Sequence, residues 1–121
     1  MTIPPWPERL YRIVSSSPPA EDEFLSNWVI RERDIAARRR PRSAPQDGDA
    51  LHMWSGVSTY DNAETAREQA RRYTLGDFIA ILRVEPNTGF RVEQTSRRTD
   101  HYTLWGTATA LLATVTGVQA A

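Results

Sequence analysis

The apolar residues of this chain come in short runs that turn-forming clusters separate. LYRIV, residues 10–14, ends at the cluster SSSPP, and FIAILRV, residues 78–84, ends before EPNTG. Short runs with β-branched residues between turn signals are typical of strands. None approaches the roughly 20 apolar residues of a membrane-spanning helix. The chain therefore has to build its core from several short elements.

Five segments predict strands, because each is short, contains β-branched or aromatic residues and lies between turn signals. These are residues 10–14, 51–59, 78–84, 90–95 and 101–105. The third and fourth, with EPNTG between them, predict a hairpin. The C-terminal VTGVQ is a candidate edge strand.

The clearest helix is predicted over residues 62–73. Asp61 or Asn62 can cap it, acidic and basic residues lie at the ends that the helix dipole favours, and small alanines let it lie close against a sheet. A second helix is predicted within residues 20–30, and TATALLATV predicts a short helix or turn. Strands and helices in this order predict an α+β fold: compact mixed or antiparallel sheets with two to three flanking helices.

The length of 121 residues fits a single domain over residues 1–121. Residues 1–9 contain three prolines and predict an N-terminal arm that Trp6 holds against the core. Residues 36–50 predict an Arg/Pro-rich loop. Six arginines lie between Arg31 and Arg42, and such a charge run is usually a solvated face, so we do not expect nucleic acid as a partner.

Composition excludes several classes of function. The formal net charge is zero, which argues against a surface devoted to nucleic acid, although a local basic patch remains possible. The chain has no cysteine, so disulfides, thiol catalysis and Cys-ligated zinc are excluded, and no metal site is expected. The N-terminal sequence lacks the apolar region of a signal peptide, which predicts a cytoplasmic protein and leaves export without a cleaved signal open.

Arg12 is the first candidate site residue. Strand alternation places it on one face with Leu10 and Val14, and a buried arginine needs an anionic or polar partner. Two interpretations stay open: an exposed arginine or one paired with an acid such as Glu93, and an arginine that binds an anionic ligand.

Two further segments carry candidate residues. Ser58, Thr59 and Tyr60 precede the helix at residues 62–73, where the hydroxyls either cap the helix or contact a ligand. His101 and Tyr102 open the strand over 101–105 and point to opposite faces of it. A lone histidine is more often structural than catalytic, so His101 is either a core residue or an acid–base group.

The chain resembles the ADP-ribosyltransferase-like fold and its bacterial NAD-dependent toxins in three segments. These are LYR in the first strand, GVSTY before a helix with small residues, and HYT in the late strand. The resemblance covers about residues 9–118. It implies that NAD is the substrate, that Arg12 binds the dinucleotide, and that the pocket contains Ser58, Thr59, Tyr60 and Tyr102. The best-characterised transferases carry a glutamate at the third motif, where this chain offers His101, with Glu93 one strand earlier.

The resemblance assigns chemistry to these residues. Cleavage of the nicotinamide–ribose bond develops positive charge on the sugar, so the site has to hold the diphosphate and stabilise that charge. Arg12 would clamp the diphosphate, Ser58 would bond the ribose or the amide, and Tyr60 would stack on the ring. His101 would act as acid or base, with Glu93 as the alternative carboxylate.

The implied function is that of a toxin or NAD-consuming enzyme that cleaves the nicotinamide–ribose bond. The expected partners are NAD or a related nucleotide, together with a target protein or a cognate antitoxin or immunity protein, and no membrane. The alternative is a non-catalytic module of the same fold that recognises a protein or nucleic acid through the arginine-rich segment. A third possibility, a metal-free nuclease, would need His52 beside His101.

Overall fold

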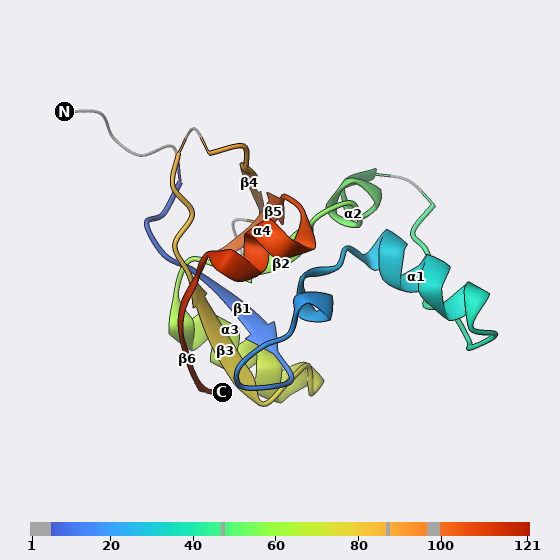
Figure 1. The fold of residues 1–121 in the computed structure, drawn as a ribbon, viewed down its shortest axis with the longest axis horizontal. Coiled ribbons are helices and arrows are strands. Elements are labelled where there is room, and N and C mark those ends of the chain that lie inside the picture. The colour runs from blue at the N-terminus through green and yellow to red at the C-terminus, as the bar shows by residue number, and fades with distance from the viewer. Residues whose placement is uncertain (1–5, 47, 87, 97–99) are drawn as a thin grey trace.

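The computed structural model describes residues 6–46, 48–86, 88–96 and 100–121 (Figure 1). The strands are β1 (Leu10–Val14), β2 (Val57–Tyr60), β3 (Phe78–Leu82), β4 (Arg91–Ser96), β5 (His101–Trp105) and β6 (Val115–Ala120). The helices are the 3₁₀ turn η1 (Glu21–Phe24), α1 (Asn27–Ala36), α2 (Gly48–Met53), α3 (Ala63–Tyr73) and α4 (Ala108–Ala113). Among the described residues, no helix combines the length and the apolar composition needed to cross a membrane.

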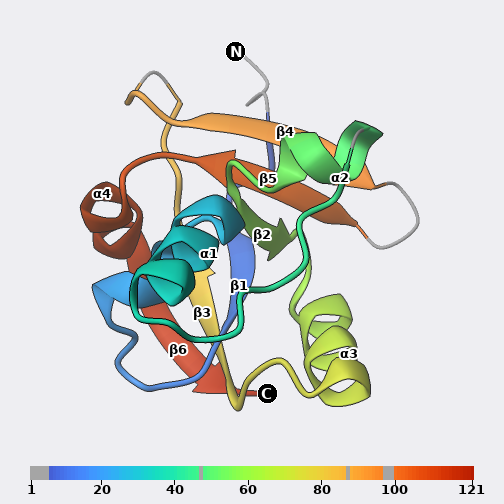
Figure 2. The ribbon, with the colours of Figure 1, turned by 90° about the vertical axis from the view of Figure 1, so that its right-hand side faces the viewer.

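The strands form one six-stranded sheet in the order β4-β5-β2-β1-β3-β6. Every neighbouring pair in it is antiparallel. Helices α3 and α4 lie on opposite sides of this sheet, and β4 and β5 run across the direction of β3 and β6 (Figure 2). The predicted α+β class is therefore confirmed, with a single strongly twisted antiparallel sheet.

The sheet opens between its two central strands. Strand β1 pairs with β3 along its whole length, from Leu10 to Val14. Within the described residues it meets β2 at a single pair, Tyr11 with Tyr60. Because the ladder does not continue past this pair, polar groups of β2 are available to side chains rather than to the backbone of β1.

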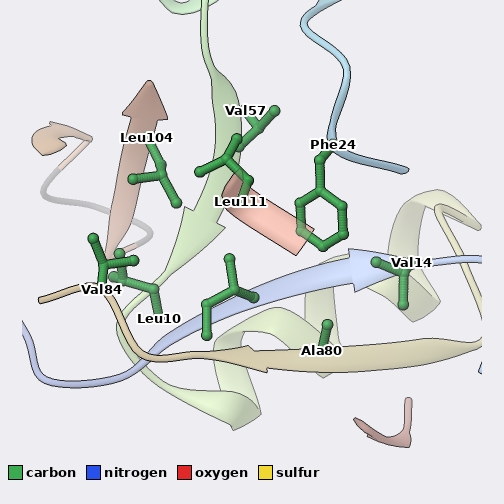
Figure 3. Close-up of a cluster of buried hydrophobic side chains, with 9 residues drawn as sticks. Leu10, Val14, Phe24, Val57, Ala80, Val84, Leu104 and Leu111 are labelled. Carbon is green, nitrogen blue, oxygen red and sulfur yellow. The ribbon is translucent and has the colours of Figure 1, made fainter. Parts of the chain in front are cut away.

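Two hydrophobic clusters cover the two faces of the sheet. The larger one packs under η1 and α4 and contains Leu10, Val14, Phe24, Val57, Ala80, Leu82, Val84, Leu104 and Leu111 (Figure 3). The smaller one packs under α3 and contains Tyr60, Ala66, Ala70 and Ile79. The prediction that alanines bring this helix close to the sheet is confirmed, since Ala66 and Ala70 are buried.

The strand pairing corrects one prediction. The hairpin expected between residues 78–84 and 90–95 is wrong, because β3 pairs with β1 and β6. Both edges of β3 are therefore occupied, and β4 pairs with β5 at the far end of the sheet. The turn signal EPNTG is present, but it does not decide which strand is the partner.

The predicted strand over residues 51–59 is wrong in its first half. Residues up to Met53 belong to α2, and the amides of Trp54, Ser55 and Gly56 donate to carbonyls three residues earlier. These local hydrogen bonds delay the strand until Val57. A Cβ atom at Gly56 would lie 2.6 Å from Cγ2 of Thr103. The backbone of this turn therefore packs so close to β5 that only glycine fits at residue 56.

The helix predicted within residues 20–30 is divided. Residues 21–24 form η1, and a separate helix α1 begins after Ser26, whose side chain accepts a hydrogen bond from the Val29 amide. Helix α1 runs to Ala36 and α2 begins at Gly48, so the predicted loop over residues 36–50 is shorter than expected.

The helix predicted over residues 62–73 is confirmed as α3, with Asn62 as its cap. The short helix of TATALLATV and the edge strand of VTGVQ are confirmed as α4 and β6. Trp6 packs on the larger cluster and its Nε1 donates to the Val84 carbonyl at 2.8 Å. This supports the predicted arm at residue 6, while residues 1–5 lie outside the described residues.

Candidate functional site

Arg12 reaches into the gap between β1 and β2. Its Nε donates to the carbonyl of Glu23 and its Nη1 donates to the carbonyl of Ser58, both at 2.8 Å. The guanidinium also lies 5.8 Å from the centroid of the Phe24 ring. Arg12 thus replaces backbone pairing at the place where the two strands separate, and it contacts neither Glu93 nor another carboxylate through a described salt bridge.

A small cleft of about 90 Å³ surrounds this guanidinium. We call it the β1–β2 notch; it is lined by Arg12, Leu25, Asn27, Ile30, Arg42, Gly56, Val57 and Ser58. Pockets that enclose a whole small molecule have volumes of about 300–1,000 Å³. The notch is therefore large enough for one group of a ligand, such as a phosphate or a single ring, with the remainder outside.

The polar lining of the notch is basic. Arg42 donates to the side-chain oxygen of Asn27, which fixes the amide at the mouth of the cleft. Burial lowers the pKa of Arg12 to about 10, against the opposing influence of Glu23 and Tyr60. Arg12 consequently stays cationic at neutral pH, and two guanidinium groups face one small cleft.

Ser58 also belongs to a row of side chains that crosses three strands. It pairs with Thr103 on β5, and Thr103 pairs with Glu93 on β4. Paired residues of adjacent strands share one face of the sheet, and strands are about 4.8 Å apart, so Ser58 and Glu93 are separated by about 10 Å on that face. Ser58 is exposed, and the side chain of Glu93 is 37% exposed.

The Glu93 carboxylate is held at both oxygens. Its Oε2 lies 2.8 Å from Nε2 of His52, and its Oε1 accepts from Arg91. These two hydrogen bonds, that of His52 first, lower the pKa of Glu93. Glu93 is therefore a fixed, accessible and ionised carboxylate.

His101 lies on the same face of the sheet as Glu93 but inside the protein. Only 9% of the residue is exposed. Its Nδ1 is 2.5 Å from the hydroxyl of Thr95, which is in turn 2.9 Å from the hydroxyl of Thr103. Its ring meets that of Tyr60 edge to face, with centroids 5.4 Å apart. The geometry is that of a core histidine in a satisfied polar network.

Burial lowers the pKa of His101 below the ordinary value of histidine, and this gives a pH dependence. The unfolded chain then binds a proton more readily than the folded one, so stability falls as the pH drops below about 6.5. We expect the melting temperature to fall between about pH 7.5 and pH 5.5, and to fall less in His101→Gln. Thermal melts at both pH values check this, and identical slopes in the two proteins would contradict it.

The other predicted pocket residues lie away from the notch. Thr59 is fully buried and its hydroxyl donates to the Tyr102 carbonyl at 3.0 Å. Tyr102 packs against the larger cluster, and burial, followed by Asp61 and Asp100, raises its pKa. Tyr60 belongs to the smaller cluster. Of the predicted residues, the structure brings Arg12 to the backbone carbonyl of Ser58. The Arg12 side chain lies on the opposite face of the sheet from the side chains of Ser58, Glu93 and His101.

The sequence gives no signal for two residues of these sites: Asn27, which lines the notch, and Arg91, which holds Glu93. Arg42 also lines the notch, and His52, considered above only for a nuclease, also holds Glu93. Arg42 lies in the arginine-rich segment. The sequence shows the positive charge of that segment, but not that Arg42 lines the notch. Within the described residues, no three His, Asp or Glu side chains gather in a way that could hold a metal ion.

Comparison with protein-family models, with curated proteins and with solved structures finds no match to this chain.

Proposed function

We propose that the β1–β2 notch binds NAD and that the protein cleaves the nicotinamide–ribose bond, as an enzyme of the ADP-ribosyltransferase-like fold. The observation that carries this proposal is the place of Arg12, a cationic fork beside Ser58 in the gap between two strands. The strands that carry the three motifs, β1, β2 and β5, are also consecutive neighbours in the sheet.

The notch offers groups suited to part of a dinucleotide. Arg12 and Arg42 can hold one phosphate of the diphosphate by charge-assisted hydrogen bonds. Asn27 can bond an amide or a ribose hydroxyl in the notch, and the Ser58 hydroxyl can do so on the other face of the sheet. Since the cleft holds one group only, the rest of NAD would extend over the open surface beside Ser58.

Glu93 is the residue that best suits the chemical step. Departure of neutral nicotinamide leaves positive charge on the ribose, and a carboxylate that is already ionised and held in place stabilises this charge without rearrangement. Glu93 lies in the same row as Ser58, on the face of the sheet opposite the Arg12 side chain. NAD held by Arg12 would therefore have to pass through the gap between β1 and β2, beside Ser58, to bring its ribose to Glu93. Buried His101 is less suited to this role, because its ring is engaged with Thr95 and Tyr60.

The acceptor of the ADP-ribosyl group is water or a nucleophile on a macromolecule. With water the products are ADP-ribose, nicotinamide and a proton. With a macromolecule the ribose carbon forms a bond to the target instead, which is the activity of a toxin and would call for an antitoxin or immunity protein in the producing cell. Nicotinamide is released in either case, so its appearance reports both reactions.

Arg42 provides the test of NAD binding at the notch. Loss of one charge-assisted contact is worth about 1.5–3 kcal/mol, so Arg42→Ala should weaken NAD binding about ten- to a hundredfold. Arg40→Ala is the matched control, because Arg40 is exposed and does not line the notch. Calorimetric titration with NAD measures both. Equal affinities in the two variants would contradict the location, and absence of wild-type binding would contradict the proposed function.

A further inference from the structure

Helix α2 is fastened to the sheet by a compact group of side chains around Glu93. The His52 ring lies 5.0 Å from the Trp105 ring, centroid to centroid. Trp105 Nε1 donates to the hydroxyl of Ser55 at 2.8 Å, and that hydroxyl donates to the His52 carbonyl at 2.8 Å. These contacts lock the end of α2 against β5 and fix the direction of the histidine ring.

The fixed ring makes its hydrogen bond to Glu93 directional. Nε2 of His52 faces Oε2 of Glu93 at 2.8 Å, and an ionised carboxylate can only accept, so Nε2 carries the proton. An exposed glutamate otherwise samples several rotamers, and holding it in one costs conformational entropy. His52 provides this restraint from a different element of the fold.

Arg91 holds the other oxygen of Glu93 in a different way. It is two residues away on the same strand, its side chain is 63% exposed, and its guanidinium lies 4.9 Å from the centroid of the Trp105 ring. Arg91 can therefore follow Glu93 as the carboxylate moves. The contact from His52, by contrast, forms only when α2 is docked on the sheet.

We infer that His52 is a positioning residue that orients the Glu93 carboxylate for stabilisation of the ribose cation, so that docking of α2 completes the reactive site. The inference rests on the proposed cleavage of NAD. It assigns His52 no contact with the substrate and no proton transfer; its contribution is to hold one carboxylate in one orientation. Its removal should therefore lower kcat rather than raise KM.

The test compares His52→Ala with His52→Gln. The Ala variant should reduce kcat for nicotinamide release about ten- to a hundredfold, the effect typical of removing a group that orients a reactive residue, with an unchanged KM for NAD. The Gln variant retains an N–H donor for Glu93 and should recover most of the rate. The pKa of the Glu93 carboxyl, followed by carbon-13 NMR, should rise in His52→Ala, because the hydrogen bond that lowers it is lost.

The outcomes separate the two proposals. Full kcat in His52→Ala, or a fall in kcat that only follows the folded fraction in a melting curve, would overturn the role of His52 while leaving NAD cleavage intact. A Gln variant no better than Ala would also overturn it. A wild-type protein that releases no nicotinamide would overturn the proposed function, and the positioning role of His52 with it.

Discussion

We expect Glu93→Gln to release nicotinamide from NAD about 10²- to 10⁴-fold more slowly than the wild-type protein, the range for loss of a charged group that acts in the transition state. The substitution keeps the size and hydrogen-bonding ability of the side chain but removes the charge that faces the ribose cation. NAD affinity should change little, because the phosphate contacts lie at Arg12 and Arg42. Nicotinamide release, calorimetry and a melting curve provide the three readouts.

The matched control is Glu85→Gln. Glu85 is an exposed glutamate that pairs with Arg83 at 3.0 Å, much as Glu93 pairs with Arg91, but it lies outside the row that contains Ser58. Its rate should equal that of the wild-type protein. If both variants keep the full rate, the assignment of Glu93 is wrong; if both lose it, the effect is not specific to the site.

The second large effect is expected from Arg12→Met, on stability as well as on binding. The apolar side chain can occupy the same space, but it leaves the carbonyls of Glu23 and Ser58 without their donor. Each unsatisfied group costs about 1–3 kcal/mol, so the loss of both donors should lower the free energy of unfolding by about 2–6 kcal/mol, and NAD binding should be lost. Urea denaturation and calorimetric titration measure the two effects.

Arg71→Met is the control, because Arg71 lies on the exposed face of α3. Its unfolding free energy and NAD affinity should match those of the wild-type protein. A further variant, Arg12→Lys, keeps the charge but not the fork, and it should bind NAD more weakly than the wild-type protein. If Arg12→Met unfolds like Arg71→Met, Arg12 does not bridge β1 and β2.

Local patterns predicted much of the fold because they are decided within a few residues. The cap at Asn62 and the alanines of α3 follow from helix geometry, and β1 and β5 follow from the alternation of their side chains. The hairpin of β3 and β4 failed because pairing is decided by the whole sheet. β3 finds partners on both sides, β1 and β6, which come from distant parts of the sequence.

The candidate site shows the same limit. Alternation correctly put Arg12 on a face with Leu10 and Val14, which join the larger cluster, and His101 on the opposite face of β5 from Tyr102. Which face of β5 continues which face of β1 depends on the pairing register of the strands between them. Tyr11 pairs with Tyr60, and Tyr60 pairs with His101. His101 therefore lies on the α3 side of the sheet, opposite the side chain of Arg12.

The notch residues on α1 and the contacts of Glu93 depend on tertiary structure alone. Asn27 reaches the cleft because the predicted helix breaks before Ser26 and restarts over the gap between the strands. His52 reaches Glu93 because residues up to Met53 are helical rather than extended. Neither event has a periodic signal in the sequence, since each results from one turn and its packing.

Titration of nitrogen-15-labelled protein with NAD, followed by NMR, tests the central claim most directly. We expect saturable shifts of the Gly56 and Ser58 amides and of the Arg12 side-chain Nε–Hε signal, while the signals of Arg71 on α3 stay in place. Shifts spread over the exposed arginines without saturation, or no shifts at all, would contradict a nucleotide site between β1 and β2.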